Sequence, residues 1–528
     1  MGIYLNPGAD MLREARRSRI YVDKSGMFSY LNMVVATSQK YVCVSRPRRF
    51  GKSMAAHMVA AYYDRTVDGA AEFRGMVCAA ASEFEESRNR FDVIRLNMQD
   101  FLSSCHDVDE VIRRVTTTLA REFSREYRGF EAVSDDALPF MMADLYAQTG
   151  CQFVIVIDEW DCVMREMQGN HEAQERYLDF LRTWLKDKSY VALCYMTGIL
   201  PIKKYGTHSA LNMFSEFSML NADEMAPYMG FTEHEVAELC HAWGCDLGDC
   251  KAWYDGYRLI GVKDSCHEAY NPRSVVRSME VGRFASYWNE TETFSALKRY
   301  VDLDLDGLHD KVVRLLAGGY VEVNTGTYAN DMTTLNSADD VLTLLVHLGY
   351  LTYDALSGEA YVPNREVMGE FANSVRDGGW DEVARSITAS ERLLDALVAG
   401  NAMEVAEGVQ RAHEDASSII AYNDENSLAC TLRLAFFSAI RRWRVVRELP
   451  AGKGFADMVL VPLASRPGNP GIVVELKYGA TAEEALAQIR ERGYERGIEG
   501  LASGGEVVLC GIAYDPKRKT HSCVIERA

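Results

Sequence analysis

The sequence has no apolar run long enough to cross a membrane. One of its longest runs, Phe153–Ile157, has five residues, whereas a membrane-spanning helix needs about 18 or more. The chain starts with a short polar stretch followed by arginines, without the apolar segment of a secretory signal. Only 12 prolines and 39 glycines occur among 528 residues, too few for a fibrous or linker-rich chain. We therefore expect a cytoplasmic globular protein that has no membrane partner.

Basic residues are outnumbered as well. The chain has 57 Lys and Arg against 76 Asp and Glu, a net charge of −19, which argues against a nonspecific nucleic-acid coat. The imbalance is not uniform, because from Ala421 to the C-terminus we count 15 basic and 13 acidic residues. A local groove for a phosphate backbone is therefore expected, if anywhere, in this last segment.

The 13 cysteines are odd in number and scattered, which favours reduced thiols over a disulfide framework. Cys240, Cys245 and Cys250 are the densest group, but their spacing is wider than that of paired zinc ligands. We interpret them as cysteines of a helix core. The length of the chain predicts about three to four domains.

Four short strands are predicted in the first half, at residues 41–45, 91–97, 153–157 and 191–197. They are mostly continuous apolar runs separated by long helical segments. This pattern is typical of a parallel sheet that is covered by helices on both faces. The first domain, residues 1–220, is therefore predicted to be α/β.

The segment RPRRFGKS joins the first of these strands to a helix. Backbone amides and the positive end of the helix dipole would then point at one spot, which suits a phosphate. In this P-loop-like arrangement Gly51 permits close approach, Lys52 reaches the terminal phosphates and Ser53 holds Mg²⁺. Arg46 stands where the standard pattern has its first glycine.

Two acidic residues, Asp158 and Glu159, end the apolar strand FVIVI. Ligand chemistry in α/β sheets gathers at this end of the strands. Asp158 is predicted to hold Mg²⁺ through water, and Glu159 to polarise the attacking water. Thr197 ends the next strand, where it would either sense the γ-phosphate or play a structural role.

The remaining chain is predicted as a mostly helical connector, residues 221–380, and a second α/β domain with preceding helices, residues 381–528. In the connector, a helix and a strand–turn–strand at 338–365 suggest a winged-helix-like fold. Helices are expected to dominate from 366 to about 447. The terminal unit is predicted to contain the strands FADMVLVPL, IVVELKY and EVVLCGIAY, with a helix from Ala482.

Asp457, Glu475 and Lys477 carry the second chemical pattern. Residues two apart on a strand share a face, so Glu475 and Lys477 point the same way. The intervening loop would return the chain so that Asp457 lies beside Glu475. Two carboxylates near a lysine can hold Mg²⁺ and activate water at a phosphodiester. A strand with surface salt bridges is the alternative interpretation.

Together, RPRRFGKS, VIVIDEWD, MTGILPIKK, WYDGYR and YNPRS resemble the AAA-ATPase-like family of prokaryotic proteins. In that family an AAA-type ATPase region precedes a PD-(D/E)XK nuclease-like domain with a restriction-endonuclease-like fold. The resemblance makes Arg46 a family trait and implies that Arg48, Arg49 and Phe50 belong to the nucleotide-binding loop. Arg273 departs from the family pattern, which often has an aromatic residue there.

The resemblance also adds residues to the nuclease pattern. It implies that Glu425 is a further metal-linked acid, that Gln488 is catalytic and that Tyr494 belongs to the same helix motif. Four arginines precede the terminal strands and either line a phosphate channel or form a solvated helix face: Arg441, Arg442, Arg444 and Arg447.

We therefore predict an ATP-binding and ATP-hydrolysing protein coupled to a Mg²⁺-dependent nuclease, with Mn²⁺ as a substitute metal. Nucleic acid, DNA rather than RNA, is the expected partner, and self-association is possible. Phage defence or DNA processing would suit such a pair by analogy. The alternatives are an ATP-dependent switch or scaffold whose C-terminal domain binds nucleic acid or a partner without cutting, and a motor that only positions DNA.

Overall fold

The computed structural model divides the chain into two compact units, each built from separate segments. The first comprises Met1–Leu239, Tyr257–Val276 and Val323–Gly358, and the second Cys240–Gly256, Arg277–Glu322 and Glu359–Ala528. The predicted domain boundaries after residues 220 and 380 remain predictions. The structure describes residues 2–130, 137–202, 211–288, 299–300, 302–303, 305, 307–329, 335–377, 381–416, 431–446, 450–451, 454–463, 468–493 and 506–528.

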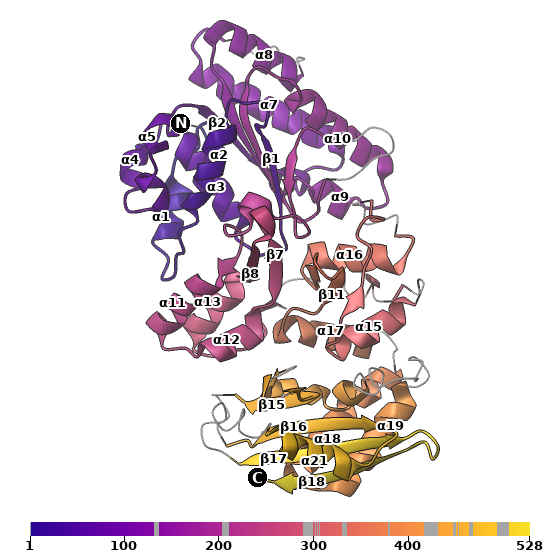
Figure 1. Ribbon diagram of the computed structural model, residues 1–528. Coiled ribbons are helices and arrows are strands. Elements are labelled where there is room, and N and C mark those ends of the chain that lie inside the picture. The colour runs from indigo at the N-terminus through magenta and orange to yellow at the C-terminus, as the bar shows by residue number, and fades with distance from the viewer. Residues whose placement is uncertain are drawn as a thin grey trace. The chain divides into compact units, whose positions relative to one another are not determined.

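A five-stranded sheet in the order β2-β3-β4-β1-β5 organises the first unit (Figure 1). Every neighbouring pair is parallel, so the predicted parallel α/β sheet is confirmed. The strands are β1 (Tyr41–Ser45), β2 (Asp92–Asn97), β3 (Phe153–Asp158), β4 (Val191–Gly198) and β5 (Ser215–Phe217). The short edge strand β5 was not among the predicted strands.

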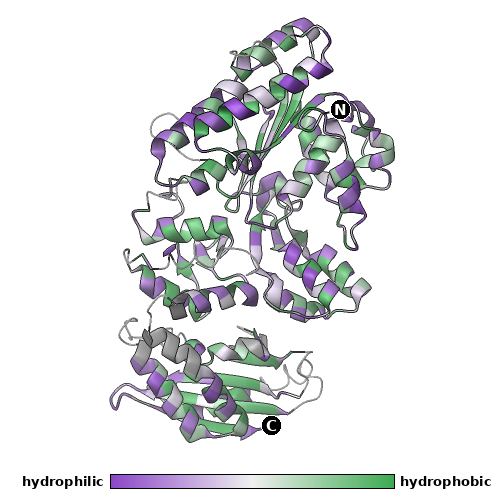
Figure 2. Cartoon of the chain, turned by 180° about the vertical axis from the view of Figure 1, so that it is seen from behind, coloured by the Kyte–Doolittle hydropathy of each residue, from purple (hydrophilic) through white to green (hydrophobic). Residues whose placement is uncertain are grey.

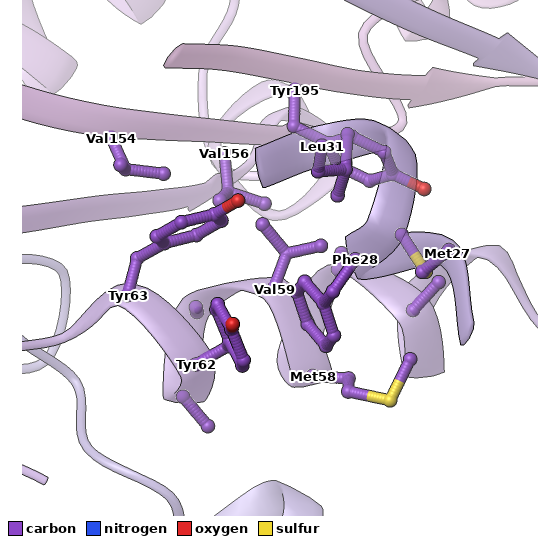
Figure 3. Packing of buried hydrophobic residues seen from close by; sticks show 14 of the residues in the cluster. Met27, Phe28, Leu31, Met58, Val59, Tyr62, Tyr63, Val154, Val156 and Tyr195 are labelled. Carbon is purple, nitrogen blue, oxygen red and sulfur yellow. The ribbon is translucent and has the colours of Figure 1, made fainter. Parts of the chain in front are cut away.

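Helices cover both faces of this sheet (Figure 1). One group of helices is α1 (Asp10–Arg16), α2 (Phe28–Val34), α3 (Lys52–Tyr63), α4 (Gly69–Glu72) and α5 (Phe84–Ser87). The remaining helices of this region are α6 (Met98–Leu102), α7 (Val108–Glu126), α8 (Leu138–Thr149), α9 (Cys162–Glu166) and α10 (His171–Leu185). The strand residues Val154, Val156 and Tyr195 pack with α2 and α3 in one buried cluster (Figure 3). In it the rings of Phe28 and Tyr62 stack with centroids 3.8 Å apart.

Later segments of the chain complete the first unit. They form an antiparallel sheet of β6 (Phe231–Thr232), β8 (Cys266–Tyr270) and β7 (Tyr257–Ile260), together with α16 (Ala338–Leu348) and β10 (Thr352–Asp354). Tyr257 Oη donates to Gly349 O at 2.9 Å, and the backbone amide of Arg258 donates to Thr352 Oγ1 at 2.9 Å. The aromatic segment WYDGYRL thus contributes a strand to the first unit.

A mixed sheet in the order β12-β15-β16-β17-β18 forms the end of the second unit. Its strands are β12 (Trp443–Val446), β15 (Met458–Pro462), β16 (Gly471–Tyr478), β17 (Val507–Asp515) and β18 (Thr520–Arg527). Only β16 and β17 are parallel. The three predicted strands of this unit and its helix, α21 (Ala482–Arg492), are confirmed. Figure 2 shows the strands of the sheet to be largely apolar.

Two apolar clusters occupy the two faces of this sheet. Alternate residues of β16, among them Val474 and Leu476, pack with α18 (Asp381–Ala399) and α19 (Ala402–Ala416), whereas Val473 packs with α21. The other elements of this unit include α12 (Leu247–Tyr254), α15 (Leu308–Leu316), β9 (Val321–Glu322), β11 (Glu359–Tyr361), α17 (Arg365–Asp377), β13 (Pro450–Ala451) and β14 (Gly454–Phe455). Two helices, α11 (Glu233–Trp243) and α13 (Pro272–Val281), each include one of the five points where the chain passes between units.

The expectation that helices extend to about 447 is wrong at its C-terminal end. Arg444 lies on β12, where Val445 pairs with Leu460 of β15, because an aromatic and two β-branched residues fill a strand against the sheet. Arg442 forms an exposed ion pair with Asp395 at 2.5 Å. The side chains of Arg441 and Arg447 lie outside the described residues.

Cys240 and Cys250 are buried in the second unit. Within the described ranges, no helix has both the length and the apolarity that crossing a membrane would require.

Substitution of Gly511 on β17 tests the packing of α21 against the sheet. It lies opposite Glu475 in the register, and a Cβ there would come within 2.2 Å of Ala482 O and 2.8 Å of Leu486 N in α21. We expect Gly511→Ala to destabilise this region by about 1–3 kcal/mol, the usual cost of overpacking. Hydrogen exchange measured by mass spectrometry should show faster exchange in α21.

Gly369→Ala is the matched control, since that helical glycine has nothing within 4 Å of an added Cβ. It should stabilise α17 by about 0.5–1 kcal/mol. Unchanged protection of α21 in Gly511→Ala would contradict the packing argument.

Candidate functional site

The loop between β1 and α3 folds around a buried lysine amine. Gly51 has a left-handed backbone (φ 87°), which glycine adopts readily, and it leads directly into the first turn of α3. Lys52 Nζ donates to the carbonyls of Arg46 at 3.0 Å and Pro47 at 2.9 Å. Ser53 is exposed in the same turn. The amine and the hydroxyl therefore lie where a helix N-terminus favours an anion.

Arg46 shows why the loop tolerates an arginine at the usual glycine position. Its side chain is fully buried, and Nη1 donates to Ser45 O at 2.9 Å and to Phe217 O at 2.8 Å. Burial lowers the pKa of this guanidinium to about 10. The side chain therefore connects β1 to β5 and leaves the inside of the loop to its backbone.

The middle of the loop is anchored by one aromatic side chain. Phe50 is buried, and its ring meets that of Tyr257 edge-on with centroids 5.1 Å apart. Its carbonyl accepts from Gly230 N at 3.1 Å. Arg48 and Arg49 remain partly exposed, and Arg49 has a left-handed backbone (φ 71°). The contact with Tyr257 was not predicted from the sequence.

Asp158 and Thr197 meet beside this loop because β3 and β4 are neighbours in register. Thr197 Oγ1 donates to Asp158 Oδ1 at 2.5 Å, while Asp158 Oδ2 is buried and has no hydrogen-bond partner among the described residues. A buried carboxylate oxygen without a partner is costly and is suited to a cation. Glu159 follows with a left-handed backbone (φ 53°), and burial raises the pKa of its carboxyl while Lys52 and Arg165 oppose that rise.

Two further residues of this site, Asp161 and Arg165, were missed at the level of sequence. Arg165 Nη2 lies 2.5 Å from Glu159 Oε2, and its Nε lies 3.2 Å from Asp161 Oδ2. Asp161 Oδ2 also accepts from the backbone amides of Ile199 at 3.0 Å and Leu200 at 2.8 Å. The sequence did contain a signal for these two residues. They are an acid and an arginine four residues apart just after the strand, a spacing that places them on adjacent turns of a helix.

His57 and Arg95 lie on the β2 side of Asp158. Arg95 Nη2 is 2.5 Å from His57 Nε2, and burial together with the Arg95 charge lowers the pKa of His57 to about 4. His57 is one helical turn beyond Ser53, so an uncharged imidazole lies on that face of α3 at neutral pH. Neither residue was expected from the sequence.

The four described residues of the second pattern come together on one face of the C-terminal sheet. Continuing the β15–β16 register by one residue places Asp457 opposite Glu475, and Asp457 Oδ2 accepts from Leu476 N at 2.8 Å. Lys477 Nζ lies 3.8 Å from Glu475 Oε1. Gln488 Nε2 of α21 donates to the same Glu475 oxygen. Helix α21 therefore covers the face that carries the carboxylate and the lysine.

The carboxyl of Glu475 is in an unfavourable place for a charge. Burial and the neighbouring charge of Asp457 raise its pKa to about 7, and its Oε2 atom is buried without a hydrogen-bond partner. Glu425 and Tyr494 lie outside the described residues. Among the residues that the structure describes, no group of three or more His, Cys, Asp or Glu could hold a metal ion. Two carboxylates and one amine are therefore what the described part of this site offers.

Comparison with known proteins finds a family match for the first of these regions. Residues 10–207 match the AAA-ATPase-like family, described as a predicted AAA-ATPase. The AAA-like region thus contains the loop, Asp158, Glu159 and Thr197, and the match ends before the C-terminal sheet. No curated protein matches the chain.

Three solved structures are similar at low identity. ORC2 of Aeropyrum pernix, in ADPNP–ADP complexes, is 10% identical over 68% of this chain and 97% of that chain, with a TM-score of 0.32. Cdc6p of Pyrobaculum aerophilum is 9% identical over 67% and 93%, with a TM-score of 0.24. ORC1 of A. pernix, in complex with DNA, is 11% identical over 71% and 98%, with a TM-score of 0.25.

Proposed function

We propose that the first unit binds and hydrolyses ATP. The observation that carries this proposal is the arrangement of Lys52, in the first turn of α3, beside Asp158 and Thr197 at the ends of two adjacent strands. Lys52 would exchange the two loop carbonyls for phosphate oxygens, and the amides at the start of α3 would bind the phosphates. Thr197 would contact the terminal phosphate, and Arg48, Arg49, Phe50 and Gly51 would shape the loop.

The residues at this site also fit a magnesium ion. Asp158 has a buried oxygen without a partner among the described residues, and Ser53 has an exposed hydroxyl; these two would hold the ion. Bound Mg²⁺ would supply positive charge that offsets the charge of the phosphate oxygens. Glu159 would orient the attacking water and accept its proton.

Lys52→Ala and Glu159→Gln should separate binding from turnover. Lys52→Ala should lower ATP affinity at least about tenfold, because a charge-assisted hydrogen bond contributes about 1.5–3 kcal/mol. Glu159→Gln should keep ATP binding and lower kcat about 10²–10⁴-fold, the range for a lost general base. Equilibrium binding of a fluorescent ATP analogue and phosphate release measure the two effects.

Lys186→Ala is the control, because it removes an amine of the same unit whose contact is with Asn212 on the exterior. It should change neither quantity. Wild-type ATP affinity in Lys52→Ala would contradict the proposed site.

We further propose that the C-terminal sheet is a Mg²⁺- or Mn²⁺-dependent nuclease. Support comes from the convergence of Asp457, Glu475, Lys477 and Gln488 on one face. Asp457 and Glu475 would hold the metal, with Glu425 as a further acid. Lys477 would orient or deprotonate the attacking water, and Gln488 would hold the Glu475 carboxylate. Nucleic acid, DNA rather than RNA, would be the substrate.

ATP would regulate this second activity. A nuclease that acts only in one nucleotide state would cut conditionally, which protects the cell's own nucleic acid. Self-association could complete the nucleotide site.

Glu475→Gln and Lys477→Ala should each abolish cleavage of labelled single-stranded, duplex and structured DNA and RNA while leaving ATP turnover unchanged. Glu475→Gln removes a metal-binding charge, whereas Lys477→Ala removes the amine beside it. The assay requires Mg²⁺ or Mn²⁺, with and without ATP. Glu483→Gln, an exposed carboxylate of α21, is the matched control and should cut normally.

If every substrate stays intact, the nuclease proposal is wrong. Nucleic-acid binding without cleavage would then indicate the switch or scaffold, and ATP-dependent movement along DNA without cleavage would indicate the motor.

A further inference from the structure

Five charged side chains gather at the end of β3, the start of α3 and the short helix α9. Asp158, Glu159 and Asp161 carry the negative charges, and Lys52 and Arg165 the positive ones. The side chains of Arg165 and Asp161 are 8% and 0% exposed. Lys52 Nζ is hydrogen-bonded to two loop carbonyls. The cation that directly contacts Glu159 within this group of described side chains is Arg165.

The backbone of Glu159 has an unusual, left-handed conformation. A left-handed backbone costs a non-glycine residue about 1–2 kcal/mol. The direction of the Glu159 side chain is therefore not the one that the extended strand would give it. Trp160 N bonds to Thr197 O at 3.0 Å, and Cys162 N bonds to Glu159 O at 3.1 Å. These bonds fix the peptide, but they leave the position of the carboxylate to its own contacts.

Arg165 provides the contact that fixes the carboxylate. Its Nη2 holds Glu159 at 2.5 Å, while its Nε lies 3.2 Å from Asp161. Asp161 is held by two backbone amides of the turn after β4. A guanidinium with two anchored contacts is oriented as well as charged, so the position of Glu159 is connected to that turn.

Stabilisation of helix α9 would explain only part of the contacts that Arg165 makes. The pair Asp161–Arg165 has the i, i+4 spacing that stabilises a helix, and a structural arginine needs no more. The pair Glu159–Arg165 spans six residues and joins the end of β3 to α9, so it does not support the helix. It instead holds the residue that the proposed reaction requires.

We infer that Arg165 is a positioning residue that holds the Glu159 carboxylate in place for ATP hydrolysis. The inference rests on the proposed ATPase function of the first unit. Arg165 acts through Glu159 and contacts no reacting atom, so its loss should affect turnover and leave ATP binding nearly unchanged. A displacement of about 1 Å of a reacting group can cost about 10²-fold in rate.

The test is a double-mutant cycle on the full-length chain, with ATP binding and ATP turnover measured separately. Arg165→Ala should lower kcat about 10²-fold and change ATP affinity less than about threefold. Arg165→Lys should recover part of kcat, because an ammonium can pair with Glu159 but lacks the second fixed contact. In a Glu159→Gln background, Arg165→Ala should cause no further loss, since residues that act as a unit are not additive.

Arg176→Ala is the matched control, because it removes an arginine from an exposed pair with Asp109 in the same unit. Arg165→Met keeps the apolar stem, so unchanged ATP binding by this variant shows that the loss of turnover is not a loss of folding.

The inference is overturned if Arg165→Ala and Arg165→Met both keep the wild-type kcat. It is also overturned if Arg165→Ala lowers kcat as much in the Glu159→Gln background as in the wild-type chain. Either result leaves the proposed ATPase function standing. A wild-type chain that turns over no ATP overturns the proposed ATPase function, and the inference is overturned with it.

Discussion

The parallel register of β1, β4 and β3 is the constraint on which the first site depends. Val44 pairs with Thr197 and Ser45 with Gly198, while Ile157 pairs with Met196. These three strands therefore end at one edge of the sheet. The loop follows the last residue of β1, whereas Thr197 and Asp158 belong to the ends of β4 and β3. Backbone hydrogen bonds along the sheet thus determine the geometry of the site before any polar side chain contributes.

Both candidate sites bury charged side chains, and each offsets the cost of that burial differently. At the first site, three acids lie near a lysine and an arginine, and hydrogen bonds from Thr197 and from backbone amides bind one oxygen of Asp158 and one of Asp161. At the second site Glu475 has Lys477 and Gln488 nearby, but burial and the charge of Asp457 still raise the pKa of its carboxyl to about 7. An isolated charge of this kind is stable only with further positive charge close by.

Much of the fold was predictable because its strands are strongly patterned. The predicted strands around residues 41, 91, 153 and 191 are present in the sheet, since continuous apolar runs of that length fit a sheet covered on both faces. Strand β18 was not predicted because it is an edge strand with polar residues and only partial burial. Strand β12 was missed because Arg444 and the arginines around it suggested a solvated helix.

The residues of the candidate sites also divide into those that a local sequence pattern predicts and those that it does not. Motif spacing located Lys52, Asp158 and Thr197, and the period of two located Glu475 and Lys477, because each depends on local geometry. Arg46 and Phe50 could be placed in the loop, but their partners Phe217 and Tyr257 lie far along the chain. Such pairings depend on tertiary packing, which no spacing rule contains.

The contact between Phe50 and Tyr257 has a consequence for the order of events during synthesis. Tyr257 is in turn hydrogen-bonded to Gly349, and the first unit includes residues up to Gly358. A ribosome that has made only the stretch matched by the family model has not yet produced the aromatic partner of the loop. The nascent loop between β1 and α3 would acquire its complete packing only after roughly two thirds of the polypeptide has emerged.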